Sequence, residues 1–114
     1  MGGKPRDMGT SRAQISMIET REIPGFESTP PPQAGQVQAV LDDPAAHSVD
    51  ASMPLFGAGT AETGSYVQVS VDGLPIGYCI SAANLNAATK GNRLLSVLIV
   101  EPQTLEVVFE ESSP

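Results

Sequence analysis

The chain has 114 residues, a net charge of −7 and an aromatic content of 4%, with no Trp. This length has room for one domain, and so few large side chains give that domain a thin core. No apolar stretch reaches the roughly 20 residues that a transmembrane helix needs.

The charge is unevenly distributed along the chain. Residues 1–21 hold four cations and two carboxylates, a net charge of +2, whereas residues 22–114 hold two cations and eleven carboxylates, a net charge of −9. Nucleic-acid binding by the acidic part is therefore disfavoured. The one cysteine, Cys79, cannot form an intramolecular disulfide, and its apolar neighbours are typical of a buried thiol. We expect a soluble protein made in the cytoplasm.

Residues 1–35 are expected to form an extended, Pro-rich N-terminal arm. Its prolines, which include the run at positions 30–32, remove backbone donors and favour an extended conformation over a helix. Two interpretations stay open: a disordered tail, or a strap that becomes ordered against a neighbour. In the second, the apolar residues of the arm bind the partner, namely Ile15, Met17, Ile18, Ile23 and Phe26.

Residues 36–114 are expected to form the folded, β-rich body. The alternation of Val37, Ala39 and Leu41 predicts a first strand over residues 36–41, which ends at the Asp42-Asp43-Pro44 sequence. A connector follows and leads into a strand through Val49. Residues 57–64 are small and Gly-rich and predict a loop.

Residues 66–80 carry the clearest hairpin pattern. Val67, Val69 and Val71 alternate with polar residues, as in a half-buried strand. Asp72-Gly73 follows, a pair that tolerates the positive φ of a type I′ turn, so residues 74–80 can return as the partner strand. Pro75 cannot donate to a ladder, which predicts that this strand lies at an edge or starts after the proline.

The C-terminal third predicts a short helix or a long loop, followed by a second hairpin. Residues 81–89 are rich in Ala and Asn, and Lys90-Gly91 ends them. The apolar run at 94–100 and the segment at 105–109 predict two strands joined by a Pro-containing turn. The predicted fold is mainly β: a small antiparallel sandwich or rolled sheet with an extended N-terminal arm.

The residues that carry most enzyme chemistry are scarce. His47 has no Cys nearby, and the carboxylates Asp42, Asp43 and Asp50 lack EF-hand spacing and are better explained by turn formation. The Gly-rich stretch at 57–64 lacks the Gly-Lys-Ser/Thr ending of a phosphate-binding loop. We therefore expect no catalytic residues, no metal, no cofactor and no enzyme activity.

Residues 65–109 resemble the interleukin-like EMT inducer domain, a small β-sandwich module of the FAM3 type. The resemblance is carried by the strand and turn at 66–76, the Lys90-led apolar strand to Val100, and the hairpin at 101–109. Leu105 stands where that family has a turn glycine, and the order of Gly91 and Arg93 is altered. The resemblance implies a sandwich that binds carbohydrate or protein ligands.

Two functions follow from these patterns. The first is a non-enzymatic structural subunit of a larger assembly, such as a virion decoration protein or a capsid or tail accessory protein, with the virion as its destination. Its arm would supply burial that the thin body lacks, and its partners would be protein subunits, copies of itself included. The alternative is a carbohydrate- or protein-binding module, in which Tyr66 and Tyr78 are the available aromatic rings for sugar stacking.

Overall fold

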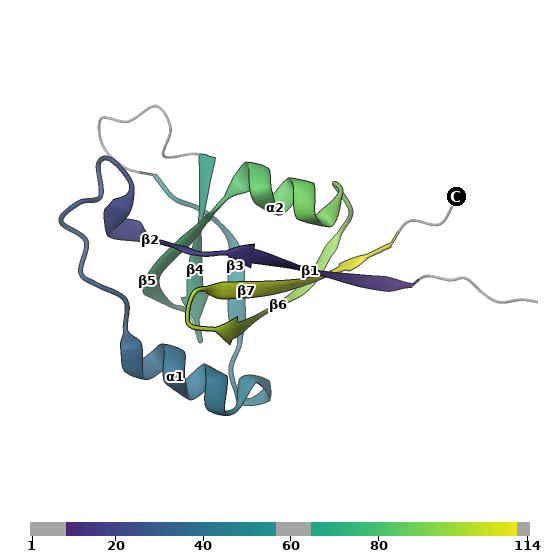
Figure 1. Ribbon diagram of the computed structural model, residues 1–114, viewed down its shortest axis with the longest axis horizontal. Coiled ribbons are helices and arrows are strands. Elements are labelled where there is room, and N and C mark those ends of the chain that lie inside the picture. Colours follow the sequence, from purple (N-terminus) through teal and green to yellow (C-terminus); the bar gives the residue numbers. More distant parts are fainter. Residues whose placement is uncertain (1–8, 57–64, 112–114) are drawn as a thin grey trace, which may run out of the picture.

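The protein is mainly β and forms two antiparallel sheets (Figure 1). The computed structural model describes residues 9–56 and 65–111. Its strands are β1 (Thr10–Ser16), β2 (Ile18–Glu19), β3 (Val49–Pro54), β4 (Tyr66–Val71), β5 (Leu74–Ser81), β6 (Leu94–Glu101) and β7 (Thr104–Glu110). The first sheet has the order β1-β7-β6 and the second the order β2-β5-β4-β3. The sandwich or rolled sheet predicted from the sequence is confirmed.

The main core lies between the two sheets, whose strands cross each other in Figure 1. Val69 and Val71 of β4 are completely buried there, and Val67 packs partly buried beside them, so the predicted alternation of this strand is confirmed. The first sheet contributes the inward-facing side chains of β6 and β7, including Ile99, Leu105, Val107 and Phe109.

The two sheets are joined along one side by a continuous stretch of chain and are not hydrogen-bonded to each other along the other side. β1 pairs with β7, and after Met17 the same chain continues as β2 and pairs with β5. On the opposite side β3 and β6 are the end strands of their sheets, and they contact each other without joining into one sheet. The result is a partly rolled structure and not a closed barrel.

The expected division between an arm and a body does not describe residues 10–35. β1 pairs over its whole length with β7, from Thr10 opposite Glu110 to Ser16 opposite Thr104. Ile15 and Met17 belong to the main core. The alternation of buried and exposed residues in β1 is the physical reason, because it gives this segment an apolar face that the sheet can bury.

The first strand expected in the body, over residues 36–41, is wrong. These residues lie in helix α1 (Ala34–Asp42), which buries Val37 and Val40. Val37, Val40 and Leu41 follow the spacing of one helix face, and a run this short fits both periods. The expected strand through Val49 is confirmed as β3.

The predicted β4–β5 hairpin and its Asp72-Gly73 turn are confirmed, with φ values of 52° and 84° at the two turn residues. The expectation for Pro75 is wrong, because β5 contains Pro75 and lies inside the sheet, between β4 and β2. Two features explain how β5 accommodates Pro75, which has no backbone N–H to donate to a neighbouring strand. β2 reaches only Tyr78 and Cys79, and the β4–β5 register shifts beside Pro75, as at a bulge.

The C-terminal elements follow the sequence predictions. Residues 82–89 form helix α2 (Ala82–Thr89), which Ser81 caps by accepting the backbone N–H of Asn84 at 3.3 Å. The helix ends at Lys90, which has a left-handed conformation, and β6 and β7 form the second hairpin. The predicted loop at 57–64 lies outside the described residues.

Candidate docking surface and clefts

The five arm residues predicted to bind a partner pack against the protein itself. Ile15 and Met17 lie in the main core. Ile23 is buried in a second cluster with Leu55 and Cys79, and Ile18 and Phe26 lie partly buried against it: all of these contacts are intramolecular. In this structure the apolar side chains of the segment therefore anchor it to its own body.

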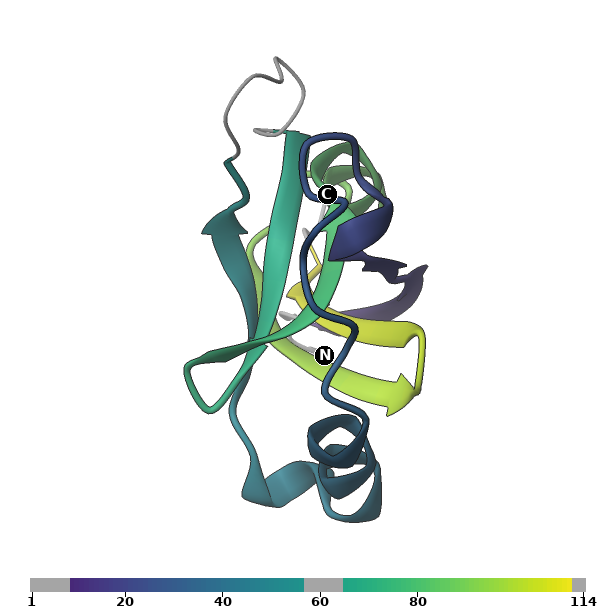
Figure 2. The same cartoon turned by 90° about the vertical axis from the view of Figure 1, so that its left-hand side faces the viewer.

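Residues 23–33 form a strap, the name used here for the segment that leads from β2 to α1. Figure 2 shows it, in dark blue, running across the four-stranded sheet towards α1. Gln33 donates its backbone N–H to the carbonyl of Ile76 at 3.1 Å, where β2 no longer covers β5. Gly77 makes the approach possible, because a Cβ there would lie 2.8 Å from the Cα of Pro32.

An open cleft of about 350 Å³ lies beside the strap, at the end of the core that α1 covers. We call it the inner cleft. Its two buried residues, Val37 and Tyr78, form its floor. Its sides carry Glu19, Arg21 and Gln38 among apolar groups from the strap, α1 and the β6–β7 turn, namely Pro31, Pro32, Ala34, Leu41 and Pro102.

Two of the polar residues of the inner cleft, Glu19 and Tyr78, stand on neighbouring strands. Glu19 lies directly opposite Tyr78 in the β2–β5 register, and its Oε1 accepts the Nε–H of Arg21 at 2.7 Å. Burial raises the pKa of Tyr78, and the negative charge of Glu19 raises that pKa further. Tyr78 is therefore a neutral hydroxyl at physiological pH.

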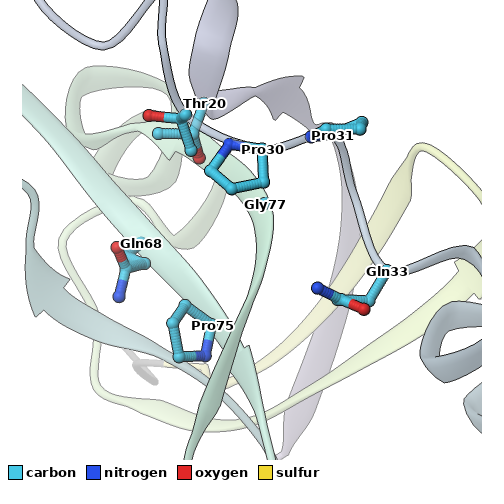
Figure 3. A pocket seen from close by; sticks show the side chains of 8 residues that line it. Thr20, Pro30, Pro31, Gln33, Gln68, Pro75 and Gly77 are labelled. Carbon is cyan, nitrogen blue, oxygen red and sulfur yellow. The ribbon is translucent and has the colours of Figure 1, made fainter.

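A second cavity, of about 290 Å³, lies on the outer side of the strap, and we call it the outer groove. In Figure 3 the strap contributes Pro30, Pro31 and Gln33, whereas Gln68 and Pro75 come from the sheet. Its polar groups are hydroxyls and amides, with no charged side chain among the residues that line it. The groove has the character of a neutral polar surface.

Large exposed apolar side chains lie on β3, just after its end, and on the neighbouring strand β6. Met53 is 61% exposed and Phe56 is 71% exposed, and Leu95 of β6 is 43% exposed. Leu95 lines a cavity of about 290 Å³ between β6 and the residues of β3 up to Ser52. We call Met53, Phe56 and Leu95 the β3 edge surface. Figure 2 shows β3 as the outermost strand of its sheet.

The groups considered for chemistry in the sequence are placed apart. Cys79 is completely buried, and its burial raises the pKa of its thiol to about 11, although a hydrogen bond with Thr20 opposes this effect. His47 Nδ1 lies 2.9 Å from Asp72 Oδ2 beside the β4–β5 turn. Within residues 9–56 and 65–111, no group of three His, Cys, Asp or Glu side chains has the arrangement of a metal site.

Neither tyrosine ring is fully exposed. Tyr78 belongs to the main core, and Tyr66 packs partly buried against the second cluster. Sequence reasoning gave Tyr78 a possible place in a sugar site, and it missed the inner cleft altogether. The sequence does place Glu19 and Arg21 two residues apart, close enough to form an ion pair. That spacing does not indicate that Glu19 pairs with Tyr78 of β5.

No family model, curated protein or solved structure matches this chain in the comparisons. In the part of the chain that the structure describes, no helix is both long and apolar enough to cross a membrane.

Proposed function

We propose that this protein is a non-enzymatic structural subunit of a larger assembly, of the virion decoration or capsid or tail accessory type. We propose that it docks on another subunit through the β3 edge surface. The observation that carries the proposal is the exposure of Met53 and Phe56, close together in sequence at the end of an edge strand. Exposed apolar groups of this size commonly mark protein contacts.

The docking is expected to use side chains more than backbone pairing. β3 has features that disfavour strand pairing with another chain and that are typical of natural edge strands. It contains Asp50 and Pro54, and its register shifts between Asp50 and Met53. These features oppose the addition of a long partner strand. They leave the apolar side chains of Met53 and Phe56 free to enter a hollow on the partner.

The net charge of the chain limits the kinds of partner that it can bind. A net charge of −7 repels a second copy and any other acidic surface, so we propose a different subunit whose docking surface is apolar and neutral or basic. The non-enzymatic part of the proposal is supported by Cys79, which is buried and protonated and therefore a poor nucleophile.

Incorporation into the assembly tests this proposal. Met53→Asp or Phe56→Asp should reduce the share of the chain in the high-mass fraction of its native source at least about tenfold, because each places a charge in an apolar contact. Sedimentation followed by immunodetection measures that share. Leu74→Asp is the matched control, because Leu74 is 62% exposed at the other end of the sheet.

Three results would count against the proposal. Normal incorporation of the Met53 and Phe56 variants would remove the β3 edge surface as the docking site, and an equal loss with Leu74→Asp would remove its specificity. A purified chain that sediments as a dimer, and that Phe56→Asp returns to a monomer, would replace the different subunit with a second copy.

A further inference from the structure

The floor of the inner cleft holds Tyr78, a largely buried residue whose hydroxyl faces no partner within the described part of the chain. Tyr78 is only 6% exposed, and within the described residues no hydrogen bond reaches its hydroxyl group. A hydroxyl set among apolar groups favours a ligand that offers it an acceptor, because such a polar group fixes the orientation of what binds. Since Tyr78 lines the cleft, a bound molecule can supply that acceptor.

The rim of the cleft has both donors and acceptors to spare. The Nε–H of Arg21 is bonded to Oε1 of Glu19, and within the described residues the two terminal nitrogens of Arg21 have no partner. Oε2 of Glu19 likewise accepts no bond from them. Gln38 donates its Nε2–H to Asp42 at 2.9 Å, which leaves its carbonyl oxygen as an acceptor.

We propose that the inner cleft binds an extended peptide segment of a partner protein and takes up one aliphatic side chain of it. The walls, which are built from prolines and Leu41, and the floor residue Val37 suit an aliphatic group. A peptide backbone presents one donor and one acceptor for each residue, which matches a rim that holds both. A carbonyl of the segment accepts the hydroxyl hydrogen of Tyr78.

Charge favours a neutral peptide over a free carboxylate. Arg21 and Glu19 form an ion pair at the cleft, so the rim carries no excess positive charge to attract an anion. The remaining chain is strongly acidic and repels one. The ligand is therefore the interior of a chain and not its C-terminal carboxylate. This inference does not depend on the β3 edge surface, which uses other residues.

A titration of the isotope-labelled full chain with capped tripeptides tests the inference. Ac-Gly-Leu-Gly-NH2 should produce saturable shifts in the backbone amide signals of Val37, Gln38 and Tyr78 in nuclear magnetic resonance spectra. Ac-Gly-Gly-Gly-NH2 lacks the side chain and should produce none. Ac-Gly-Leu-Gly with a free carboxylate should bind more weakly than the amide. Equal shifts with all three peptides, or no saturable shift, would overturn the proposal.

Tyr78→Phe separates binding from folding. It should weaken the binding of Ac-Gly-Leu-Gly-NH2 roughly threefold to tenfold, the range expected for one lost hydrogen bond. The melting temperature should stay level, because the substitution removes no hydrogen bond found within the described residues. Tyr66→Phe is the control and should leave the affinity unchanged, since Tyr66 does not line the cleft. Unchanged affinity in Tyr78→Phe would refute the role of the hydroxyl.

Discussion

Tyr78 and Cys79 are neighbours in β5, yet their side chains belong to opposite faces of the sheet. Burial raises the pKa of both groups, but the consequences differ. The thiol lies in a closed cluster under the strap and is hydrogen-bonded with Thr20. The phenol lies on the floor of a cleft that a ligand can enter. Because successive side chains of a strand point to opposite faces, the thiol of Cys79 is enclosed while the phenol of Tyr78, one residue earlier, lines the inner cleft.

Cys79 is expected to resist thiol reagents in the folded protein. With a pKa of about 11 and no exposed surface, it is protonated and inaccessible at pH 8. Reaction with DTNB at pH 8, followed by absorbance, should release no measurable thionitrobenzoate from the native chain. The same chain in guanidinium chloride should release one equivalent, because the sequence has one cysteine. Rapid labelling of the native chain would contradict the closed cluster.

Asp72 gives the protein a pH-dependent contribution to stability. The backbone N–H of Ser48 and the ring of His47 both bond its carboxylate, and they lower its pKa below the usual 3.8. A lowered pKa in the folded state means that the contribution is complete above pH 3.8 and is lost as the pH falls through the folded-state value.

Asp72→Asn keeps the turn geometry, because Asn also tolerates a positive φ, and it removes the charge. The native chain should be more stable than Asp72→Asn at pH 7, and the difference should shrink below pH 3.8 and disappear once the pH is below the folded-state pKa of Asp72. Urea unfolding at a series of pH values measures it. A difference that persists unchanged at pH 2 would show that the charge is not the cause.

At the scale of elements, helix α1 and the strap could not be predicted from the local sequence pattern, whereas strand β4 could. Strict alternation over six residues predicted β4, since a helix would scatter Val67, Val69 and Val71 around its axis. The run that contains Val37 and Val40 is short and fits both periods, so only tertiary packing decides that it is α1. The path of the strap depends on Gly77, which lies more than forty residues after Pro32 and carries no signal of this contact.

Gly77→Ala tests the packing of the strap. Gly77 has a φ of +88°, and an added Cβ would lie 2.8 Å from the Cα and 3.0 Å from the N of Pro32. The substitution should lower the free energy of unfolding by about 2 kcal/mol or more, through backbone strain and displacement of the strap. Gly73→Ala is the matched control: its φ is +84° and nothing lies within 4 Å, so it should cost only about 1 kcal/mol. Equal losses in urea unfolding would show that the strap can move away freely.

At the scale of the whole molecule, the N-terminal segment joins the two sheets. β1 completes the first sheet beside β7, and β2 pairs with β5 of the second. The sequence predicted both hairpins because their partner strands are close together along the chain. Pairing of Thr10 with Glu110 spans nearly the whole chain, and no local pattern encodes it. The inner cleft needs β2, β5, α1 and the β6–β7 turn together, so it could not be predicted either.

Truncation distinguishes an independent body from one that requires its first strands. Removal of residues 1–35 deletes β1, β2 and the strap, together with the buried side chains of Ile15, Met17 and Ile23. The loss of three buried apolar side chains costs about 2–5 kcal/mol each, which exceeds the stability typical of a small domain when combined with the loss of a strand. We therefore expect residues 36–114 to show no cooperative thermal transition by circular dichroism.

Removal of residues 1–8 alone, the matched control, keeps every described contact and should leave a cooperative transition. A cooperative β-type melt of residues 36–114 would show that the body folds alone and that the N-terminal segment is an arm after all.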